Sequence, residues 1–196
     1  KTKLSNAERA LSNFDEREQL VNIGGVVSLA ADELQKLTNQ LIESQVALQR
    51  NQAIYEQVNR PNVSLDELST VPEVLNHPSI QAVKREEIVA QSKISELKEV
   101  YGPKHPRMIA AMAETNSIQQ SLREQISRLV SGITNEFMTT RAKVNALRAD
   151  IEVAKSKFRE LTTLESQRRT VQRDVDTNKQ LYDSFFTRLK ETDQLG

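Results

Sequence analysis

The chain has 196 residues, and its 27 lysines and arginines balance its 27 aspartates and glutamates, so the formal net charge is zero. A balanced charge gives no electrostatic reason to bind nucleic acid or an anionic surface, and the lack of cysteine excludes disulfides and thiolate metal sites. Only 37% of the residues are hydrophobic and 4% aromatic, which argues against a thick globular core and favours long helices with a narrow apolar stripe.

The first predicted helix covers residues 2–20, with the apolar stripe Leu4, Ala7, Leu11 and Phe14. The paired glycines Gly24 and Gly25 predict a turn or extended link over residues 21–27. A second helix is predicted over about 29–59, capped by Ser28. Two polar residues, Ser44 and Asn51, interrupt its stripe, which consists of Leu34, Leu37, Leu41, Leu48, Tyr55 and Val58.

Residues 59–79 contain three prolines and are predicted to be an irregular loop. Within it, Ser64 and Glu67 have the spacing of a capping box, which predicts one helical turn near residues 65–68. A third helix is predicted from Pro78 or Ser79 to Tyr101, and Gly102 is expected to end it in a left-handed conformation. Its predicted stripe is Ile80, Val83, Ala90, Ile94, Leu97 and Tyr101.

A sharp turn is predicted over residues 102–106, because a glycine and two prolines within five residues cannot continue a helix. The turn residues are Gly102, Pro103, His105 and Pro106. A fourth helix should then run to about residue 192. Its upper stripe is predicted to be Ile109, Met112, Leu122, Ile126, Leu129 and Ile133. A stutter in this stripe near Gly132 predicts a local bend.

From Phe137 to Leu189 an apolar residue recurs in alternating steps of three and four, which is typical of a coiled coil. Arg168 and Asn178 lie in this seam, where polar groups can fix register and oligomeric state. The sequence therefore predicts an all-α, elongated antiparallel coiled coil or helical hairpin bundle with one very long C-terminal helix, as a single domain over 1–196. The second and third helices form either one arm broken by the loop or two antiparallel helices.

No catalytic, cofactor or metal site is predicted, so the chain is expected not to be an enzyme. The only two histidines, His77 and His105, each precede a proline, and neither lies in a nucleophile or metal-ligand motif. Tyr182, Phe185 and Phe186 form the main aromatic cluster. Packing inside the base of the bundle is the expected role of this cluster; the alternatives are sugar stacking and a place at a membrane edge.

Three motifs together resemble the periplasmic coiled coils of bacterial polysaccharide co-polymerases, the Wzc- and GumC-like members of the Wzz chain-length-determinant superfamily. The stretch Tyr101-Gly-Pro-Lys-His-Pro-Arg-Met108 is similar to the turn of that family. The stretch Arg173-Asp-Val-Asp-Thr-Asn-Lys-Gln-Leu-Tyr182 resembles the family's membrane-proximal segment, with Leu181 as part of the motif. The helix around Asn6 to Phe14 resembles the one that precedes the family's hairpin.

The resemblance implies the periplasmic portion of an inner-membrane protein that controls polysaccharide chain length and export of exopolysaccharide or capsule. The partners it implies are further copies in a homo-oligomer, a polysaccharide polymerase, an outer-membrane export channel and the polysaccharide itself, but no nucleic acid. The chain would be a fragment joined to the membrane by flanking helices, and some family members also carry a cytoplasmic tyrosine kinase domain. The alternative is a generic structural coiled-coil hairpin of the adaptor or chromosome-organising type.

Overall fold

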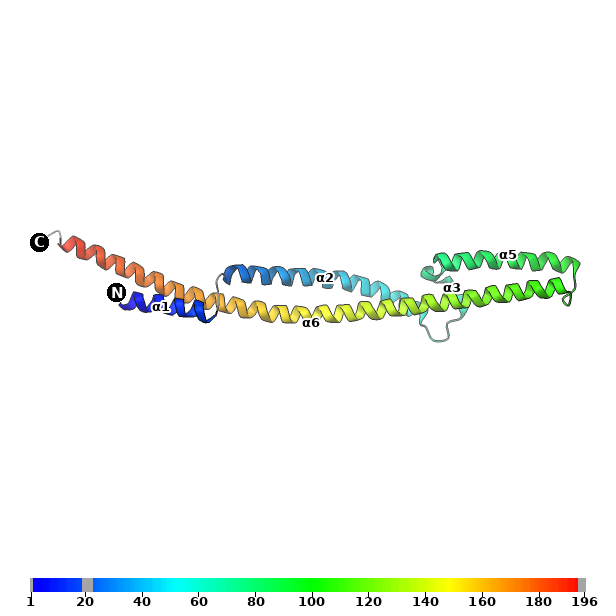
Figure 1. The fold of residues 1–196 in the computed structure, drawn as a ribbon, viewed down its shortest axis with the longest axis horizontal. Coiled ribbons are helices and arrows are strands. Elements are labelled where there is room, and N and C mark those ends of the chain that lie inside the picture. Colours follow the sequence, from blue (N-terminus) through cyan, green and yellow to red (C-terminus); the bar gives the residue numbers. More distant parts are fainter. Residues whose placement is uncertain (1, 19–22, 194–196) are drawn as a thin grey trace. The chain divides into compact units, whose positions relative to one another are not determined.

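A computed structural model describes residues 2–18 and 23–193 of the chain. Over these residues the fold is all-α, as predicted, with six helices and no strand (Figure 1). The helices are α1 (Thr2–Arg17), α2 (Ile23–Val58), α3 (Leu65–Thr70), α4 (Pro72–Leu75), α5 (Pro78–Val100) and α6 (Pro106–Asp193). The 88 residues of α6 confirm the very long C-terminal helix, and it continues without a break through Gly132 and Thr163. The bend at Gly132 stays a prediction.

The chain divides into two compact units, one made of residues 1–41 and 146–196 and the other of residues 42–145. Both boundaries fall inside helices, one in α2 and one in α6. The expectation of a single elongated domain over 1–196 stays a prediction.

In the first unit, α1 packs antiparallel against the last third of α6. Phe14 of α1 is buried, and Leu4, Ala7 and Leu11 are half-buried, which confirms the predicted stripe. Asp15, near the end of α1, contacts Arg168, whereas the start of α1 lies beside residues 178–189. On α6 the seam residues of this unit that are buried are Leu147, Ile151, Ala154 and Val175.

The predicted link over residues 21–27 is wrong where the structure describes it, because α2 already begins at Ile23. Gly24 and Gly25 therefore lie in the first helical turn, Ser28 is not a cap, and residues 21 and 22 lie outside the described part. Ile23 and Ala30 are buried at 7% and 6% exposure. Glycine costs a helix about 1 kcal/mol relative to alanine, and burial of these side chains offsets that cost.

In the second unit, the later part of α2 and then α5 pack antiparallel against successive stretches of α6 (Figure 1). Tyr55 of α2 stacks on Phe137 with ring centroids 4.5 Å apart. Lys93 of α5 pairs with Glu114 at 3.0 Å. Both helices run antiparallel to α6, so they run in the same direction as each other. Of the two predicted alternatives, the single arm broken by the loop is therefore correct, and the alternative of two antiparallel helices is wrong.

The insertion between α2 and α5 is more ordered than the predicted loop 59–79. The predicted capping box is confirmed, with the Glu67 N–H donating to Ser64 Oγ at 3.2 Å and the Ser64 N–H donating to Glu67 Oε2 at 2.9 Å. The loop prediction is correct for residues 59–64, 71, 76 and 77, which lie outside the helices. It is wrong for residues 69–70, 72–75 and 78–79, which are helical, with Pro72 starting α4. A proline suits a first helical position, where its missing N–H is not needed. This segment supplies core residues to a cluster of Val58, Val71, Val74, Ile80, Val83, Leu122 and Ile126.

The start of α6 buries a different face from the predicted one. Ile109 and Met112 are 56% and 48% exposed, whereas Met108, Ala111 and Thr115 are buried. The buried stripe is offset by one residue in these first turns, whereas Leu122 and Ile126, later in the predicted upper stripe, are buried as predicted. The short turn before α6 fixes which face of the helix is buried first, so the geometry of the connection overrides the size of the apolar side chains.

Candidate functional site

The predicted turn over residues 102–106 forms the connection between α5 and α6. Tyr101 ends α5 in an extended conformation and donates its N–H to the Leu97 carbonyl at 2.8 Å. His105 donates its N–H to the Gly102 carbonyl at 3.0 Å, and Pro106 begins α6 as predicted. The predicted left-handed Gly102 is wrong, since no described glycine has a positive φ. The following Pro103 explains this, because a residue before proline is restricted to extended conformations.

Three side chains lock this turn. The Tyr101 and His105 rings stack with centroids 4.0 Å apart. Arg107 donates from Nη1 to the Tyr101 hydroxyl at 3.2 Å, and its guanidinium lies 5.7 Å from the centroid of that ring. The Arg107 N–H donates to His105 Nδ1 at 3.2 Å, so this imidazole caps the N-terminus of α6. Tyr101 and Arg107 lie in the stretch that resembles the family turn, but their side-chain contacts were not predicted.

Of the two predicted seam residues, Arg168 makes a contact between helices. Its Nε and Nη2 donate to the two carboxylate oxygens of Asp15 at 2.7 and 3.1 Å. The side chains are 35% and 29% exposed, so water screens the pair only in part. The hydrogen bond to Asp15 raises the pKa of Arg168 and outweighs the opposing effect of burial. This bidentate pair joins α1 to α6 at one register.

Asn178, the other predicted seam residue, bonds within its own helix. Its Nδ2 donates to the Asp174 carbonyl at 2.8 Å. Among the described residues, no hydrogen bond from its side chain crosses to α1. Asn178 instead lines an open hollow beside the start of α1.

Sequence reasoning missed how the other polar seam residues pair. Asn51, predicted only as an interruption of the stripe, donates from Nδ2 to Thr140 Oγ1 at 3.0 Å. Asn59 donates in the same way to Thr134 Oγ1 at 3.1 Å. Each bond joins α2 or the residue after it to α6. The available signal for the first pair was that Asn51 falls in step with the α2 stripe and Thr140 with the α6 stripe. Asn59 and Thr134 each come one residue after a stripe position, so spacing gave no signal for the second pair.

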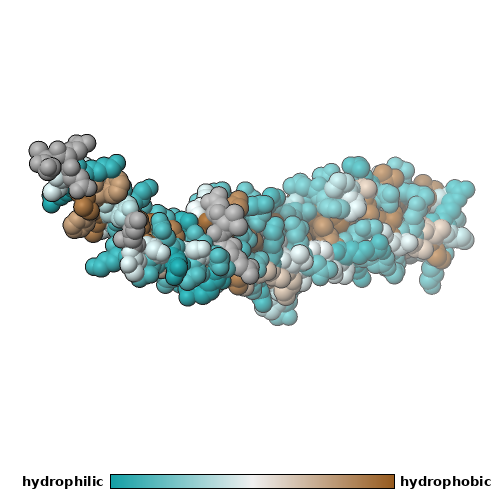
Figure 2. All heavy atoms as spheres, turned by 60° about the vertical axis from the view of Figure 1, so that its left-hand side comes forward, coloured by the Kyte–Doolittle hydropathy of each residue, from teal (hydrophilic) through white to brown (hydrophobic). Residues whose placement is uncertain are grey.

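The hollow near the C-terminal end of α6 has a volume of about 750 Å³ and is mainly apolar (Figure 2). It is lined by Thr2, Lys3, Leu4, Asn178, Leu181, Tyr182, Phe185, Phe186 and Leu189. Tyr182 stacks with Phe186 at 6.2 Å between centroids, and Lys190 Nζ lies 4.7 Å from the Phe186 centroid. Phe185 and Phe186 are 66% and 49% exposed, so the prediction that this cluster packs inside the base is wrong for these two rings.

The third residue of the predicted family motif, Arg173, lies apart from this hollow. It is exposed and lines a shallow polar depression with Ser166, Arg169 and Gln172. Leu181 and Tyr182 of the same motif line the apolar hollow. The motif therefore spans two faces of α6.

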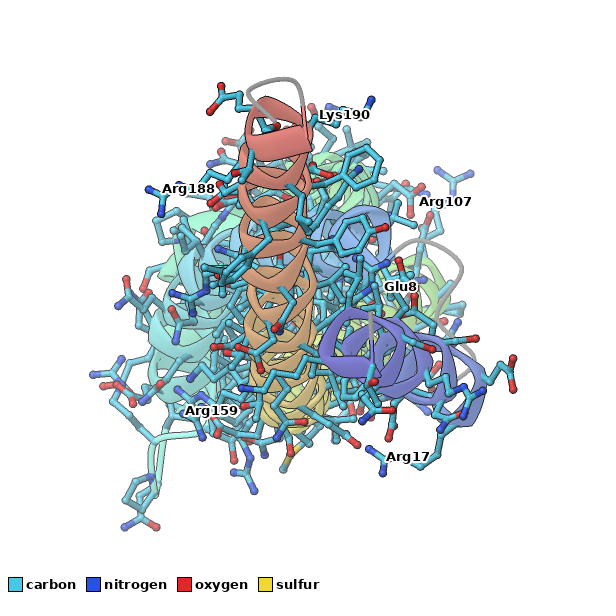
Figure 3. All side chains as sticks on the ribbon, turned by 90° about the vertical axis from the view of Figure 1, so that its left-hand side faces the viewer. Glu8, Arg17, Arg107, Arg159, Arg188 and Lys190 are labelled. Carbon is cyan, nitrogen blue, oxygen red and sulfur yellow. The ribbon has the colours of Figure 1, made fainter. Side chains whose placement is uncertain are left out.

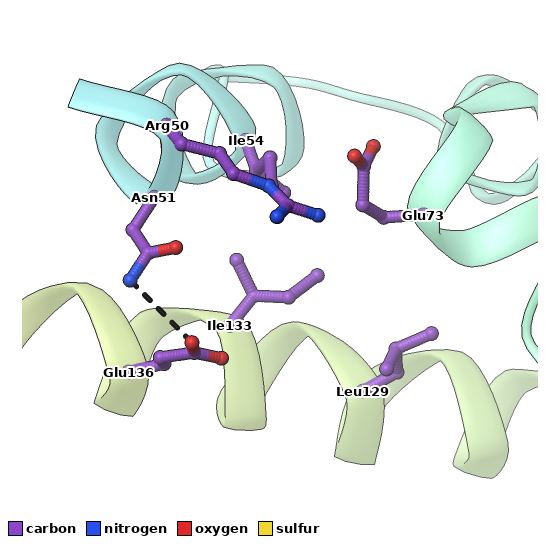
Figure 4. Close-up of a pocket in the computed structure, with 7 residues that line it drawn as sticks. All are labelled: Arg50, Asn51, Ile54, Glu73, Leu129, Ile133 and Glu136. Carbon is purple, nitrogen blue, oxygen red and sulfur yellow. Dashed lines mark hydrogen bonds between the residues drawn. The ribbon is translucent and has the colours of Figure 1, made fainter. Parts of the chain in front are cut away.

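A small cavity of about 300 Å³ lies between α2, α4 and α6 (Figure 4). Arg50 points across it towards Glu73, and Asn51 donates to Glu136 Oε1 at 3.5 Å. Its apolar lining comes from Ile54 of α2 on one side and from Leu129 and Ile133 of α6 on the other. Within the described part of the chain, no three histidines, aspartates and glutamates cluster in a way that could hold a metal ion.

No protein-family model matches this chain, and neither does any curated protein or solved structure. The resemblance to polysaccharide co-polymerases therefore depends on the three sequence motifs alone. No helix in residues 2–18 and 23–193 is long and apolar enough to cross a membrane.

Proposed function

We propose that the chain is a non-catalytic helical arm of a bacterial polysaccharide co-polymerase, located in the periplasm and acting through contacts with other proteins or with the polymer. The observation that carries the proposal is the turn motif from Tyr101 to Met108. The motif coincides with the connection of the α5–α6 hairpin, and its own residues lock the turn.

The arrangement of the seam also supports a mechanical role. The helices pair along one narrow stripe, and polar pairs such as Asn51 with Thr140 hold one register. When helices are held in one register, a movement at one end of a pair moves the other end, and this requires no reactive site. In this proposal the turn meets a partner, and self-association of the full-length protein gathers several arms.

Disruption of the gene in its native host tests the proposal. We expect a changed length distribution or amount of a surface polysaccharide on a gel, restored by the full-length gene. A variant with Tyr101→Ala and Arg107→Ala should fold but restore the phenotype poorly, whereas the control Lys143→Ala, on an exposed part of α6, should restore it. An unaltered polysaccharide after gene disruption would contradict the proposal. The generic structural coiled coil would then be the remaining hypothesis.

A further inference from the structure

The two histidine–proline pairs of the chain each lie at the start of a long helix. His77 comes directly before α5 and His105 directly before α6, so each histidine caps its helix. The His77 carbonyl accepts the Gln81 N–H at 3.0 Å. The His105 carbonyl accepts the N–H groups of Met108 and Ile109 at 2.9 and 3.0 Å. The backbones of the two caps are therefore alike, and the difference between them lies in what each imidazole contacts.

The imidazole of His105 accepts a hydrogen bond that only the neutral ring can accept. The Arg107 N–H donates to Nδ1 of this ring at 3.2 Å. A backbone N–H can only donate, so Nδ1 carries no proton and the proton of the neutral ring lies on Nε2. Protonation of Nδ1 would place a second N–H against the N–H of Arg107. The hydrogen bond that satisfies this free donor at the start of α6 would then be lost.

The imidazole of His77 has a partner that accommodates both charge states. Its Nδ1 lies 2.8 Å from the Ser79 hydroxyl oxygen. A hydroxyl can either donate or accept a hydrogen bond, so this contact survives protonation of the ring. The His77 side chain makes no capping hydrogen bond to the backbone of α5. His77 therefore provides a comparison within the same chain, because it holds the same position at a helix start without the same dependence on charge.

The groups that contact His105 disfavour a positive charge on its ring. Tyr101, at the end of α5, stacks on the imidazole with centroids 4.0 Å apart. The guanidinium of Arg107, on α6, lies 5.7 Å from the centroid of the same tyrosine ring, and Arg107 is exposed at the edge of the molecule (Figure 3). A cationic imidazole would share the Tyr101 ring with this guanidinium, and it would lie at the positive end of the α6 dipole.

No carboxylate compensates for such a charge. The first turn of α6 contains no acidic residue. The other charged residues close in sequence are Lys104 in the turn and Lys98 and Glu99 at the end of α5. Among residues 2–18 and 23–193, no carboxylate forms an ion pair with His105. Protonation of this ring in the intact turn therefore breaks a hydrogen bond and gains no ion pair in return.

We propose that His105 makes the α5–α6 turn sensitive to pH, with the turn closed while the imidazole is neutral and loosened when it is protonated. Imidazoles change charge between about pH 5 and 8. The capping bond needs the neutral ring, so its contribution is complete at the upper end of this range and is lost as the pH falls. The inference depends on the turn alone, whereas its effect on a partner that meets the turn rests on the proposed function.

Amide hydrogen exchange of the full chain tests the proposal, with each rate compared with the intrinsic rate at the same pH. Between about pH 7.5 and pH 5, the protection of the Arg107, Met108 and Ile109 amides should fall at least about fivefold. The Gln81 amide at the start of α5 should change less than about twofold, because the His77 contact survives protonation. Equal losses at both helix starts, or no protection of the Arg107 amide at the higher pH, would overturn the proposal.

His105→Asn is the matched variant, because asparagine is a favoured capping acceptor that does not titrate. In this variant the protection of the Arg107 amide should stay within about twofold over the same pH range. The control His77→Asn should keep the wild-type loss at α6. A loss in His105→Asn as large as in the wild type would overturn the proposal.

Nitrogen-15 NMR of the wild-type imidazole provides a readout that needs no variant. At the higher pH, Nε2 of His105 should carry the ring proton and Nδ1 should carry none. A proton on Nδ1 at that pH would overturn the proposal. Because both measurements report on the turn and not on any polysaccharide, their failure would be distinguishable from a failure of the proposed function.

Discussion

The ion pair between Asp15 and Arg168 should control whether α1 stays on α6. Exposed ion pairs contribute about 0.2–1 kcal/mol, and breaking a buried pair costs about 3–5 kcal/mol. This pair is about one-third exposed and bidentate, at 2.7 and 3.1 Å. We therefore expect a coupling free energy of about 1 kcal/mol, at the upper end for exposed pairs.

A double-mutant cycle isolates this coupling. Asp15→Ala and Arg168→Ala should each lower the amide hydrogen-exchange protection of α1 about fivefold, because about 1 kcal/mol of local opening free energy is lost. The double variant should lose little more than either single one. Lys155→Ala serves as the control, since its ion pair with Glu152 is exposed and lies within α6.

A coupling below about 0.2 kcal/mol at low salt would refute the reasoning, because the pair would then behave as a fully solvated one. Arg168→Leu separates stability from register. Leucine restores the apolar seam, so α1 should stay protected while spin labels on α1 and α6 report more than one distance. A single distance in that variant would show that Arg168 does not set the register.

Three further changes are expected to have defined effects. Val144→Ala should lower the free energy of unfolding in urea by about 2 kcal/mol, because Val144 is fully buried, whereas exposed Val153→Ala should change it by less than about 0.5 kcal/mol. Gly132→Ala should raise the thermal midpoint, with about 1 kcal/mol gained, since a Cβ there meets no atom within 4 Å; an unchanged midpoint would count against a regular helix at that residue. The Ser64 N–H and hydroxyl hold the pKa of Glu67 below its usual value. The stability that the capping box contributes is therefore fully present above the usual pKa of Glu67 and is lost as the pH falls through its lowered pKa. An NMR titration of Glu67 should show this, and Ser64→Ala should raise its pKa; no rise would contradict the capping-box assignment.

Periodicity predicted the seam because a helix that packs against one partner helix at a time buries one narrow stripe. The residues at seam spacing in the middle of α6, such as Val144, Leu147 and Ile151, are all buried. The same rule found Leu4, Ala7, Leu11 and Phe14 on α1. A stripe of this kind depends only on local spacing, which the sequence states directly.

The same rule failed at the start of α6, where the preceding turn decides which face of the helix is buried. At the start of α6, two candidate stripes differ by one residue, and Ile109 with Met112 is the more apolar choice. The structure buries Met108 and Ala111 instead, because the turn locked by Tyr101 and His105 orients the first helical residues. A side-chain stack between two residues of a turn leaves no periodic signal, so apolar size was a misleading guide there.

Glycine and proline were also misleading as helix breakers. Gly24 and Gly25 lie in the first turn of α2, and their cost to the helix is small against the burial of Ile23. Pro72 begins a short helix that places Val74 in the core. Both outcomes depend on tertiary burial, which local propensity does not contain.

The polar seam residues show why contacts between residues far apart in the chain could not be predicted from the sequence. Asn51 meets Thr140 and Arg168 meets Asp15, pairs that are 89 and 153 residues apart. Each of these partners fits an ordinary solvated position when viewed alone, and only the register of the antiparallel pairing joins them. Asn178 lies in the same seam, but the described part of the chain offers it no partner across a helix interface. A polar residue at seam spacing therefore predicts a bond between helices only where the register places a polar group opposite it, and that register is not contained in the spacing of one helix.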